Sequence, residues 1–179
     1  MQLRSATIAD AEAIAAIHAA SWRSTYRGAL SDEYLAGDVV ADRIAVWSKR
    51  LGHPGRNQYV VVAETPERPE RIAGFACAYA REHPEWGSLL DNLHVVQDLQ
   101  GKGLGALLLR DVAAWCAAVA PDSPLYLWVL ENNVRAQSFY LKLGAVDAGH
   151  DFWASPDGRA IPSYRFAWDR PSLLLHREG

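Results

Sequence analysis

Residues 88–110 read SLLDNLHVVQDLQGKGLGALLLR, and this stretch decides the fold of the chain. Its first part is apolar and favours a β-strand, and its last part starts an apolar pattern with the period of a helix. From Leu104 onward the apolar side chains recur at steps of three and four residues, at Leu104, Leu107, Leu108, Val112, Trp115, Cys116 and Val119. The sequence therefore predicts a strand that passes through a polar turn into a helix.

The turn between this strand and helix contains three alternate glycines, Gly101, Gly103 and Gly105. Glycine allows positive φ angles and close approach of the backbone to a ligand. The first N–H groups of a helix have no partner within it, and the helix dipole adds positive potential there. The turn therefore predicts a binding site for an anion, and a phosphate suits it. A tight turn without a ligand is the alternative interpretation.

Two common phosphate-binding motifs do not fit this turn. A P-loop requires Gly-x-x-x-x-Gly-Lys-Ser/Thr, which the sequence lacks. A dinucleotide-binding fold requires Gly-x-Gly-x-x-Gly after its first strand, whereas here the third glycine comes too early and the turn lies in mid-chain.

A second block of sequence follows the first. It reads Leu127-x-Val129-x-x-x-Asn133-x-x-Ala136-x-x-Phe139-Tyr140-x-x-Leu143-Gly144-Ala145. Together with Gln100-x-x-Gly103-x-Gly105, it resembles the GNAT family of N-acetyltransferases, in which the first motif holds the pyrophosphate of acetyl-CoA. The resemblance is sharp over residues 88–145. The family often has arginine in place of Gln100 and phenylalanine in place of Ala145.

The resemblance implies the α/β (α+β) fold of the acyl-CoA N-acyltransferases. This fold has a mixed, strongly twisted sheet of six or seven strands, a central parallel pair that splays apart, and about four helices. The splay is expected between the strands that end near Val95 and Val129. We expect one GNAT domain over residues 1–170, followed by a C-terminal tail over residues 171–179 that extends along the surface.

The resemblance also implies acetyl-CoA (coenzyme A) as the cofactor. Asn133 would contact the coenzyme arm, or cap the helix that follows it, or both. Lys102 would add positive charge near the phosphates or remain solvated. The expected cofactor-binding residues are Leu93, His94, Val95, Gln100, Gly101, Lys102, Gly103, Leu104, Gly105, Asn133, Ala136 and Tyr140.

Direct acetyl transfer to an amine through a tetrahedral intermediate needs an oxyanion site, a proton donor and a proton acceptor. In the family a backbone N–H of a bulged central strand binds the oxyanion, which corresponds here to residues 93–95. Tyr140 is the expected catalytic acid, which protonates the leaving thiolate. Asp91 is the first candidate for the base and His94 the second, while Glu131 could orient the amine. Strand alternation puts Asp91 and His94 on opposite faces unless a bulge intervenes, so at most one is expected to face the acceptor.

Trp22 and Tyr26 lie one helical turn apart in a Trp-x-x-x-Tyr-x-Gly run. This run resembles a subgroup of bacterial GNAT proteins, some of them related to polyamine acetylases. The expected substrate-binding residues are Trp22, Tyr26 and Asp91, because an aromatic wall beside a carboxylate suits a cationic amine. Core packing is the alternative for both aromatics. His18 is expected to be a packed residue rather than a catalyst.

The composition narrows the classes of function further. A chain of 179 residues, 50% of them hydrophobic, suits one domain with a sizeable core. A formal charge of −3 and the lack of a long apolar run argue against nucleic acid and membrane as partners. Cys77 and Cys116 lack metal-ligand spacing, so we expect reduced thiols, no metal and a cytoplasmic protein. The sequence does not decide whether the chain forms a homodimer.

Three hypotheses of function follow. The first is an acetyl-CoA-dependent N-acetyltransferase that acts on a primary amine of a small molecule, polyamine-like or other, or of a protein. The second is a non-catalytic acyl-CoA-binding regulatory module, whose acceptor pocket would be closed or lack a base. The third is a different nucleotide binder, such as a dinucleotide protein.

Overall fold

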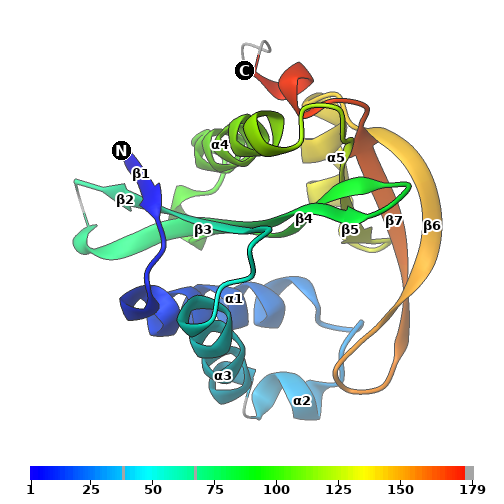
Figure 1. The fold of residues 1–179 in the computed structure, drawn as a ribbon. Coiled ribbons are helices and arrows are strands. Elements are labelled where there is room, and N and C mark those ends of the chain that lie inside the picture. Colours follow the sequence, from blue (N-terminus) through cyan, green and yellow to red (C-terminus); the bar gives the residue numbers. More distant parts are fainter. Residues whose placement is uncertain (38, 67, 176–179) are drawn as a thin grey trace.

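The computed structural model describes residues 1–37, 39–66 and 68–175 and contains one seven-stranded sheet between two layers of helices (Figure 1). The strand order is β1-β2-β3-β4-β5-β7-β6, with β4 and β5 parallel and the other neighbours antiparallel. The strands are β1 (Gln2–Ser5), β2 (Gln58–Thr65), β3 (Arg68–His83), β4 (Gly87–Val95), β5 (Leu125–Leu130), β6 (Val146–Ala154) and β7 (Ala160–Trp168).

Five α-helices lie in the described ranges, close to the expected number of about four. They are α1 (Ala11–Thr25), α2 (Asp32–Ala36), α3 (Val39–Gly52), α4 (Leu104–Val119) and α5 (Val134–Lys142). The described residues also contain three 3₁₀ helices, η1 (Ile8–Asp10), η2 (Gln97–Leu99) and η3 (Pro171–Leu174). The mixed seven-stranded sheet with its central parallel pair confirms the expected fold class.

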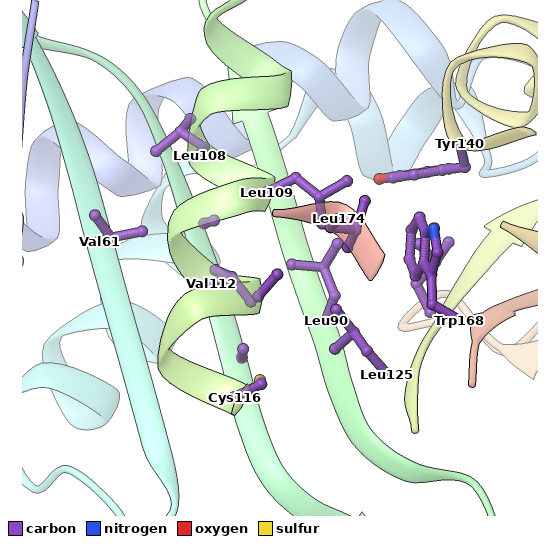
Figure 2. Packing of buried hydrophobic residues seen from close by; sticks show 14 of the residues in the cluster. Val61, Leu90, Leu108, Leu109, Val112, Cys116, Leu125, Tyr140, Trp168 and Leu174 are labelled. Carbon is purple, nitrogen blue, oxygen red and sulfur yellow. The ribbon is translucent and has the colours of Figure 1, made fainter. Parts of the chain in front are cut away.

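Helices α4 and α5 cover one face of the sheet, and α1 and α3 cover the other (Figure 1). On the second face, Trp47 of α3 packs edge-on against Phe75 of β3, with ring centroids 5.0 Å apart. The helical period predicted for α4 fits most of its buried side (Figure 2), but Leu107 and Val119, which the pattern included, are exposed. The α4 residues buried against the sheet are Leu104, Leu108, Leu109, Val112, Ala113 and Cys116.

The prediction of a surface tail over residues 171–179 is wrong for the first residues of that segment. Pro171 and Leu174 are buried in η3, and Leu174 joins the apolar cluster under α4 (Figure 2). Burial of this leucine removes apolar surface from water, which holds the segment against the domain. Residues 176–179 lie outside the described residues.

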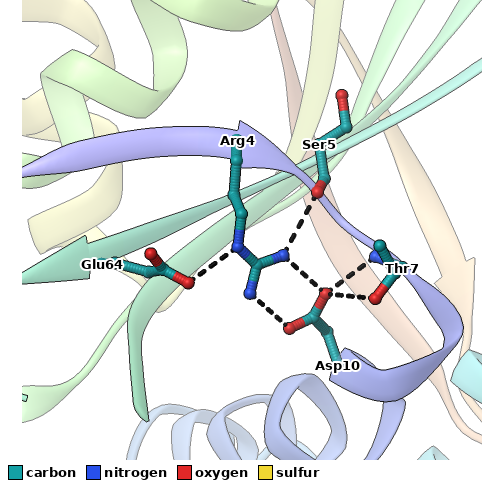
Figure 3. A network of polar contacts seen from close by, with 5 residues as sticks. All are labelled: Arg4, Ser5, Thr7, Asp10 and Glu64. Atoms are coloured by element: carbon teal, nitrogen blue, oxygen red, sulfur yellow. Dashed lines mark hydrogen bonds and ion pairs between the residues drawn. The ribbon is translucent and has the colours of Figure 1, made fainter. Parts of the chain in front are cut away.

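An ion-pair network fixes the chain where β1 leads into α1 (Figure 3). The Arg4 guanidinium donates to both carboxylate oxygens of Asp10, at 2.8 Å each, and to Glu64 of β2 at 2.7 Å. Asp10 also accepts a hydrogen bond from the Thr7 backbone N–H at 2.7 Å. Arg4 therefore lowers the pKa of Asp10, and the network ties the first helix to the edge of the sheet.

The starts of β4 and β5 are held close together. Gly87 begins β4 with φ of 85°, and a Cβ on it would lie 2.4 Å from the carbonyl oxygen of Pro124. The Ser88 backbone N–H donates to that same oxygen at 2.8 Å. Glycine is thus required at residue 87 by both its φ angle and the close approach of the next strand.

The two strands part soon after this contact. Their parallel ladder consists of two residue pairs, Ser88 with Leu125 and Leu89 with Tyr126. Beyond it β4 continues to Val95. The expected splay of the central pair is therefore present, and it opens a gap in the middle of the sheet.

Replacement of Gly87 by alanine tests this contact. G87A is expected to lower the free energy of unfolding by about 3 kcal/mol, because a positive φ and a backbone clash are both imposed. This corresponds to a fall in Tm of roughly 6–12 °C. G28A is the matched control: Gly28 has φ of 82°, but a Cβ there meets no atom within 4 Å. Equal Tm losses in the two variants would contradict the role of the contact.

Candidate active site

Strand β4 contains a β-bulge at Asp91. The ladder with β3 pairs Leu90 with Ala78 and Asn92 with Cys77, which leaves Asp91 without an opposite residue. The bulge expected at residues 93–95 is therefore misplaced, because these residues pair with β3 in a regular register.

The bulge changes which residues of β4 face each layer. Leu90 and Leu93 both pack into the cluster under α4, although they are three residues apart. His94 faces the other layer, where its ring centroid lies 4.7 Å from that of His18. Both Asp91 and His94 line the cavity on that side. The prediction that at most one of them faces the acceptor side is therefore wrong, because the extra residue shifts the alternation by one.

The glycine turn between β4 and α4 lies open at the surface. Gly101 and Gly103 have φ of 81° and 84°, and a Cβ on either would meet no atom within 4 Å. A ligand can therefore approach the backbone of both residues. The Gln100 side chain connects the turn to the end of β4, since its Nε2 donates to the carbonyl oxygen of Val95 at 3.0 Å.

The first turn of α4 has no side-chain cap. Gly103 occupies the N-cap position, so the N–H groups at the helix start receive no side-chain acceptor there. These N–H groups, the helix dipole and the open backbone fit the diphosphate of acetyl-CoA. Lys102 is exposed beside them, and the buried Leu104 anchors the helix start. A Cβ on Gly105 would contact the Phe139 ring of α5 at 3.4 Å.

The start of α5 differs from that of α4 because it is capped. The Asn133 side-chain oxygen accepts a hydrogen bond from the Ala136 N–H at 3.2 Å. Ala136 packs against the cluster under α4. The capping role expected for Asn133 is therefore present, and its contact with the coenzyme stays a prediction.

Tyr140 reaches from α5 into the interior of the protein (Figure 2). Its ring packs edge-on against Trp168 of β7, with centroids 6.2 Å apart. Burial, and then its neighbour Tyr26, raise the pKa of the Tyr140 hydroxyl. Since Tyr26 follows α1 on the opposite face of the sheet, this interaction crosses the gap between β4 and β5. Tyr140 is therefore a buried, protonated phenol beside that gap.

A cavity of about 640 Å³ lies on the α1–α3 face, against the splayed parts of β4 and β5. The β6–β7 hairpin supplies a further wall. Among the described residues, the aromatic side chains that line it besides two histidines are Trp22, Tyr26, Trp86, Trp128, Phe152 and Trp153. The acidic and basic side chains that line it are Arg43, Arg50, Asp91 and Asp151.

The β6–β7 hairpin curves away from the sheet, and its tip reaches the loop before α2 (Figure 1). Asp157 at the tip accepts a hydrogen bond from the Ser31 N–H at 2.6 Å, and Arg159 donates to the Ala29 carbonyl at 3.2 Å. Trp153 of this hairpin then meets Trp22, with ring centroids 5.8 Å apart. The hairpin therefore closes one side of the cavity.

Trp22 and Tyr26 pack in the protein and also line the cavity, and their contact with a substrate stays a prediction. Trp22 is 5% exposed and belongs to an apolar cluster between α1, α2 and the hairpin. Both rings also line the cavity, and their centroids are 5.6 Å apart. Burial and the nearby Asp91 carboxylate raise the pKa of Tyr26 to about 12.

Asp91 is held by an ion pair across the cavity wall. Its Oδ2 accepts from Arg50 Nη1 of α3 at 2.6 Å and from Asn92 Nδ2 at 2.5 Å. The Arg50 guanidinium also lies over the Trp47 ring, 5.1 Å from its centroid. Asp91 is therefore fixed in position, with Oδ2 already occupied.

His18 and His94 form a neutral imidazole pair in the cavity wall. The His18 Nδ1 accepts from Trp47 Nε1 at 3.0 Å, and the His94 Nδ1 lies 2.9 Å from Ser21 Oγ. Burial lowers the pKa of His94 to about 4, and burial with nearby positive charge lowers the pKa of His18. His18 is packed, as expected, but it also lines the cavity.

Other residues depart from what the sequence indicated. Glu131 does not line the cavity; its carboxylate accepts from the Tyr164 hydroxyl at 3.3 Å. The sequence analysis missed Arg43 and Arg50. These arginines lie seven residues apart, two turns along the same helix, with Trp47 between them. That spacing was a usable signal for one helical face.

The comparisons with known proteins agree with this geometry. A profile described as the Acetyltransferase (GNAT) family matches residues 12–145. The splayed pair, the uncapped α4 turn and the buried phenol define an acyl-CoA-binding transferase, and the chain belongs to the GNAT family. It is an N-acetyltransferase, and its acetyl donor is acetyl-CoA.

Three known proteins are similar to this chain over most of its length. It is 27% identical over 166 residues to a probable N-acetyltransferase, Rv2775, of Mycobacterium tuberculosis, covering 90% of each chain. A GCN5-related N-acetyltransferase from Rhodopseudomonas palustris has the same fold, with a TM-score of 0.70, 23% identity and 93% of each chain covered. The PaiA N-acetyltransferase of Thermoplasma acidophilum, in complex with coenzyme A, aligns with a TM-score of 0.63 and 18% identity over 90% of this chain and 96% of that one.

Within the described ranges, no helix has the length and apolar character needed to cross a membrane. A search of the same residues finds no group of three or more histidine, cysteine, aspartate or glutamate side chains placed to hold a metal ion.

Reversal of the charge at Lys102 tests the anion site. K102E is expected to weaken acetyl-CoA binding about tenfold, because a negative charge would then face the phosphates. The loss should shrink at high salt, since exposed charges are screened. Calorimetric titration with acetyl-CoA measures it. K49E, an exposed site on α3 across the sheet, is the control; an equal loss in both variants would contradict the site.

The histidine pair predicts a fall in stability at mildly acidic pH. Both folded-state pKa values lie below the unfolded value of about 6.5, so the unfolded chain binds more protons as pH falls. The free energy of unfolding should therefore be full well above pH 6.5 and decline as the pH falls from 6.5 to about 4, the folded-state pKa of His94, by up to about 1.4 kcal/mol per pH unit for each proton.

Urea unfolding at several pH values measures this slope. H94Q removes one titrating group and should flatten the slope, whereas H53Q, at an exposed position after α3, should not. An unchanged slope in H94Q would contradict the assignment.

Proposed function

We propose that the enzyme transfers the acetyl group directly from acetyl-CoA to a primary amine of a small molecule bound in the cavity. The cavity itself carries this proposal: it encloses about 640 Å³ at the gap in the sheet, across from the α4 turn. Walls on the sheet, two helices and the hairpin suit a small acceptor better than a protein chain. A non-catalytic module was expected to have a closed pocket, and this cavity argues against it.

The coenzyme would be held along the α4 side of the gap. The turn amides from Gly101 to Gly105 would bind the diphosphate, with Lys102 adding charge. The coenzyme arm would pass between β4 and the start of α5, beside Asn133 and Ala136. The thioester is the activated acetyl group that acetyl-CoA supplies. Backbone N–H groups of β4 beyond the parallel ladder, near Leu93, would donate to the acetyl carbonyl oxygen.

Tyr140 would donate the proton that the leaving thiolate needs. Its raised pKa keeps the hydroxyl protonated at neutral pH, and it lies beside the gap through which the thioester would reach the acceptor. A thiol with a pKa of about 8.5 is a fairly good leaving group, so the acid contributes modestly.

Asp91 is the proposed proton acceptor, directly or through a water molecule, and His94 is the second candidate. Both line the cavity beside each other because of the bulge. Arg50 donates a hydrogen bond to Asp91 Oδ2, so Oδ1 would be the oxygen that accepts the proton from the amine. His94 is neutral at pH 7, so its imidazole can accept a proton without a prior deprotonation.

The buried, free thiols of Cys77 and Cys116 suit a reducing compartment, and we propose a cytoplasmic location. A homodimer stays a prediction, with the edge strand β6 and its exposed Phe152 as the candidate surface.

Release of free thiol from acetyl-CoA, measured over a panel of primary amines, tests the function. Y140F is expected to lower kcat about ten- to a thousandfold and to leave the Kd for acetyl-CoA within about twofold, because only the proton donor is lost. Y164F, which removes an exposed hydroxyl outside the cavity, should retain wild-type kcat. Acetyl-CoA binding without turnover of any amine would contradict the proposal, and wild-type kcat in Y140F would contradict the role of the phenol.

A further inference from the structure

The charges of the acceptor cavity do not suit a polycation. Two arginines and two aspartates line it, and the two histidines beside them are neutral. Asp91 is already paired with Arg50. With Arg50 and Asp91 balancing each other, a polyamine would meet one carboxylate without an arginine partner, Asp151, and one further guanidinium that repels it, that of Arg43.

Arg43 is the cation in the cavity wall whose guanidinium has a donor nitrogen available for a ligand. Its Nε and Nη2 both donate to Asp42 Oδ2, at 3.1 and 2.6 Å. None of the hydrogen bonds found in the described part of the chain uses its Nη1. The side chain is 12% exposed, and Asp42 does not line the cavity. The remaining edge of a nearly buried guanidinium is thus the part that an acceptor can reach.

Trp22 holds this guanidinium flat in the cavity wall. The Arg43 Cζ lies 4.4 Å from the centroid of the Trp22 ring. A stacked, planar guanidinium loses little freedom when it binds a carboxylate, which it matches in geometry. The same stacking covers that face of Trp22, so it is not open to the ammonium group of a substrate.

From these contacts we infer that the acceptor is an amino acid-like molecule, with a carboxylate that binds Arg43 and an apolar, aromatic body. This inference rests on the proposed function and names the class of its substrate. The aromatic body would lie against rings such as Trp128 and Trp153, and the amine would point to Asp91 and His94.

Matched acceptors that differ only in the carboxylate test the inference. Tryptophan and tryptamine form one pair, phenylalanine and phenethylamine another, and spermidine represents the polyamines. The wild-type enzyme is expected to prefer the acid of each pair by about tenfold to a hundredfold in kcat/KM. R43Q should bring that ratio close to one, R43K should keep part of it, and K49Q, on the exposed side of α3, should leave it unchanged.

Calorimetry separates this inference from the function on which it rests. Tryptophan and tryptamine are titrated into the complex of the enzyme with coenzyme A. Tighter binding of tryptophan in the wild type, lost in R43Q, supports the inference whether or not turnover follows. Turnover with a preference for tryptamine or spermidine overturns the inference and leaves the proposed function intact. A preference for the acid that persists in R43Q overturns the role of Arg43. No acetylation of any amine overturns the proposed function, and the titrations then decide the inference alone.

Discussion

The site depends on two parallel strands that are held at one end and released at the other. Gly87 lies close to the Pro124 carbonyl where the strands start, and after a ladder of two residue pairs β4 and β5 diverge. Helices cover both faces of the sheet, so the diverging strands lie between two helical layers (Figure 1). The glycine turn before α4 and the cavity on the α1–α3 face thus lie on either side of the same pair of strands.

The bulge at Asp91 adds a second constraint to the same strand. One unpaired residue in β4 turns His94 toward the acceptor layer while Leu93 stays under α4. Without it, strict alternation would point Asp91 and His94 to opposite faces. Hydrogen-bond irregularity of this kind depends on the partner strand, in this case on Cys77 and Ala78, and leaves no clear mark on the sequence of β4 itself.

The features that sequence predicted are those fixed by local rules. The glycine turn and α4 follow from positive φ angles and a helical period, and the Asn133 cap follows from its place before α5. The features that could not be predicted from the sequence depend on how the helical layers pack against the sheet. Arg43 is one of several polar residues on α3 until the face that meets the cavity is known, and the burial of Leu174 appears only once η3 meets α4.

Burial shifts the pKa values of two side chains near the gap in opposite directions. Loss of water penalises the charged form of any side chain, so it raises the pKa of the Tyr140 phenol and lowers that of the His94 imidazole. The first effect keeps the Tyr140 hydroxyl protonated at neutral pH, and the second keeps the His94 imidazole neutral. Asp91, on the same strand as His94, is held in place by its ion pair with Arg50. The same low-dielectric surroundings therefore favour a protonated phenol on one side and a neutral imidazole on the other, the states that the proposed acid and the second candidate for the base require.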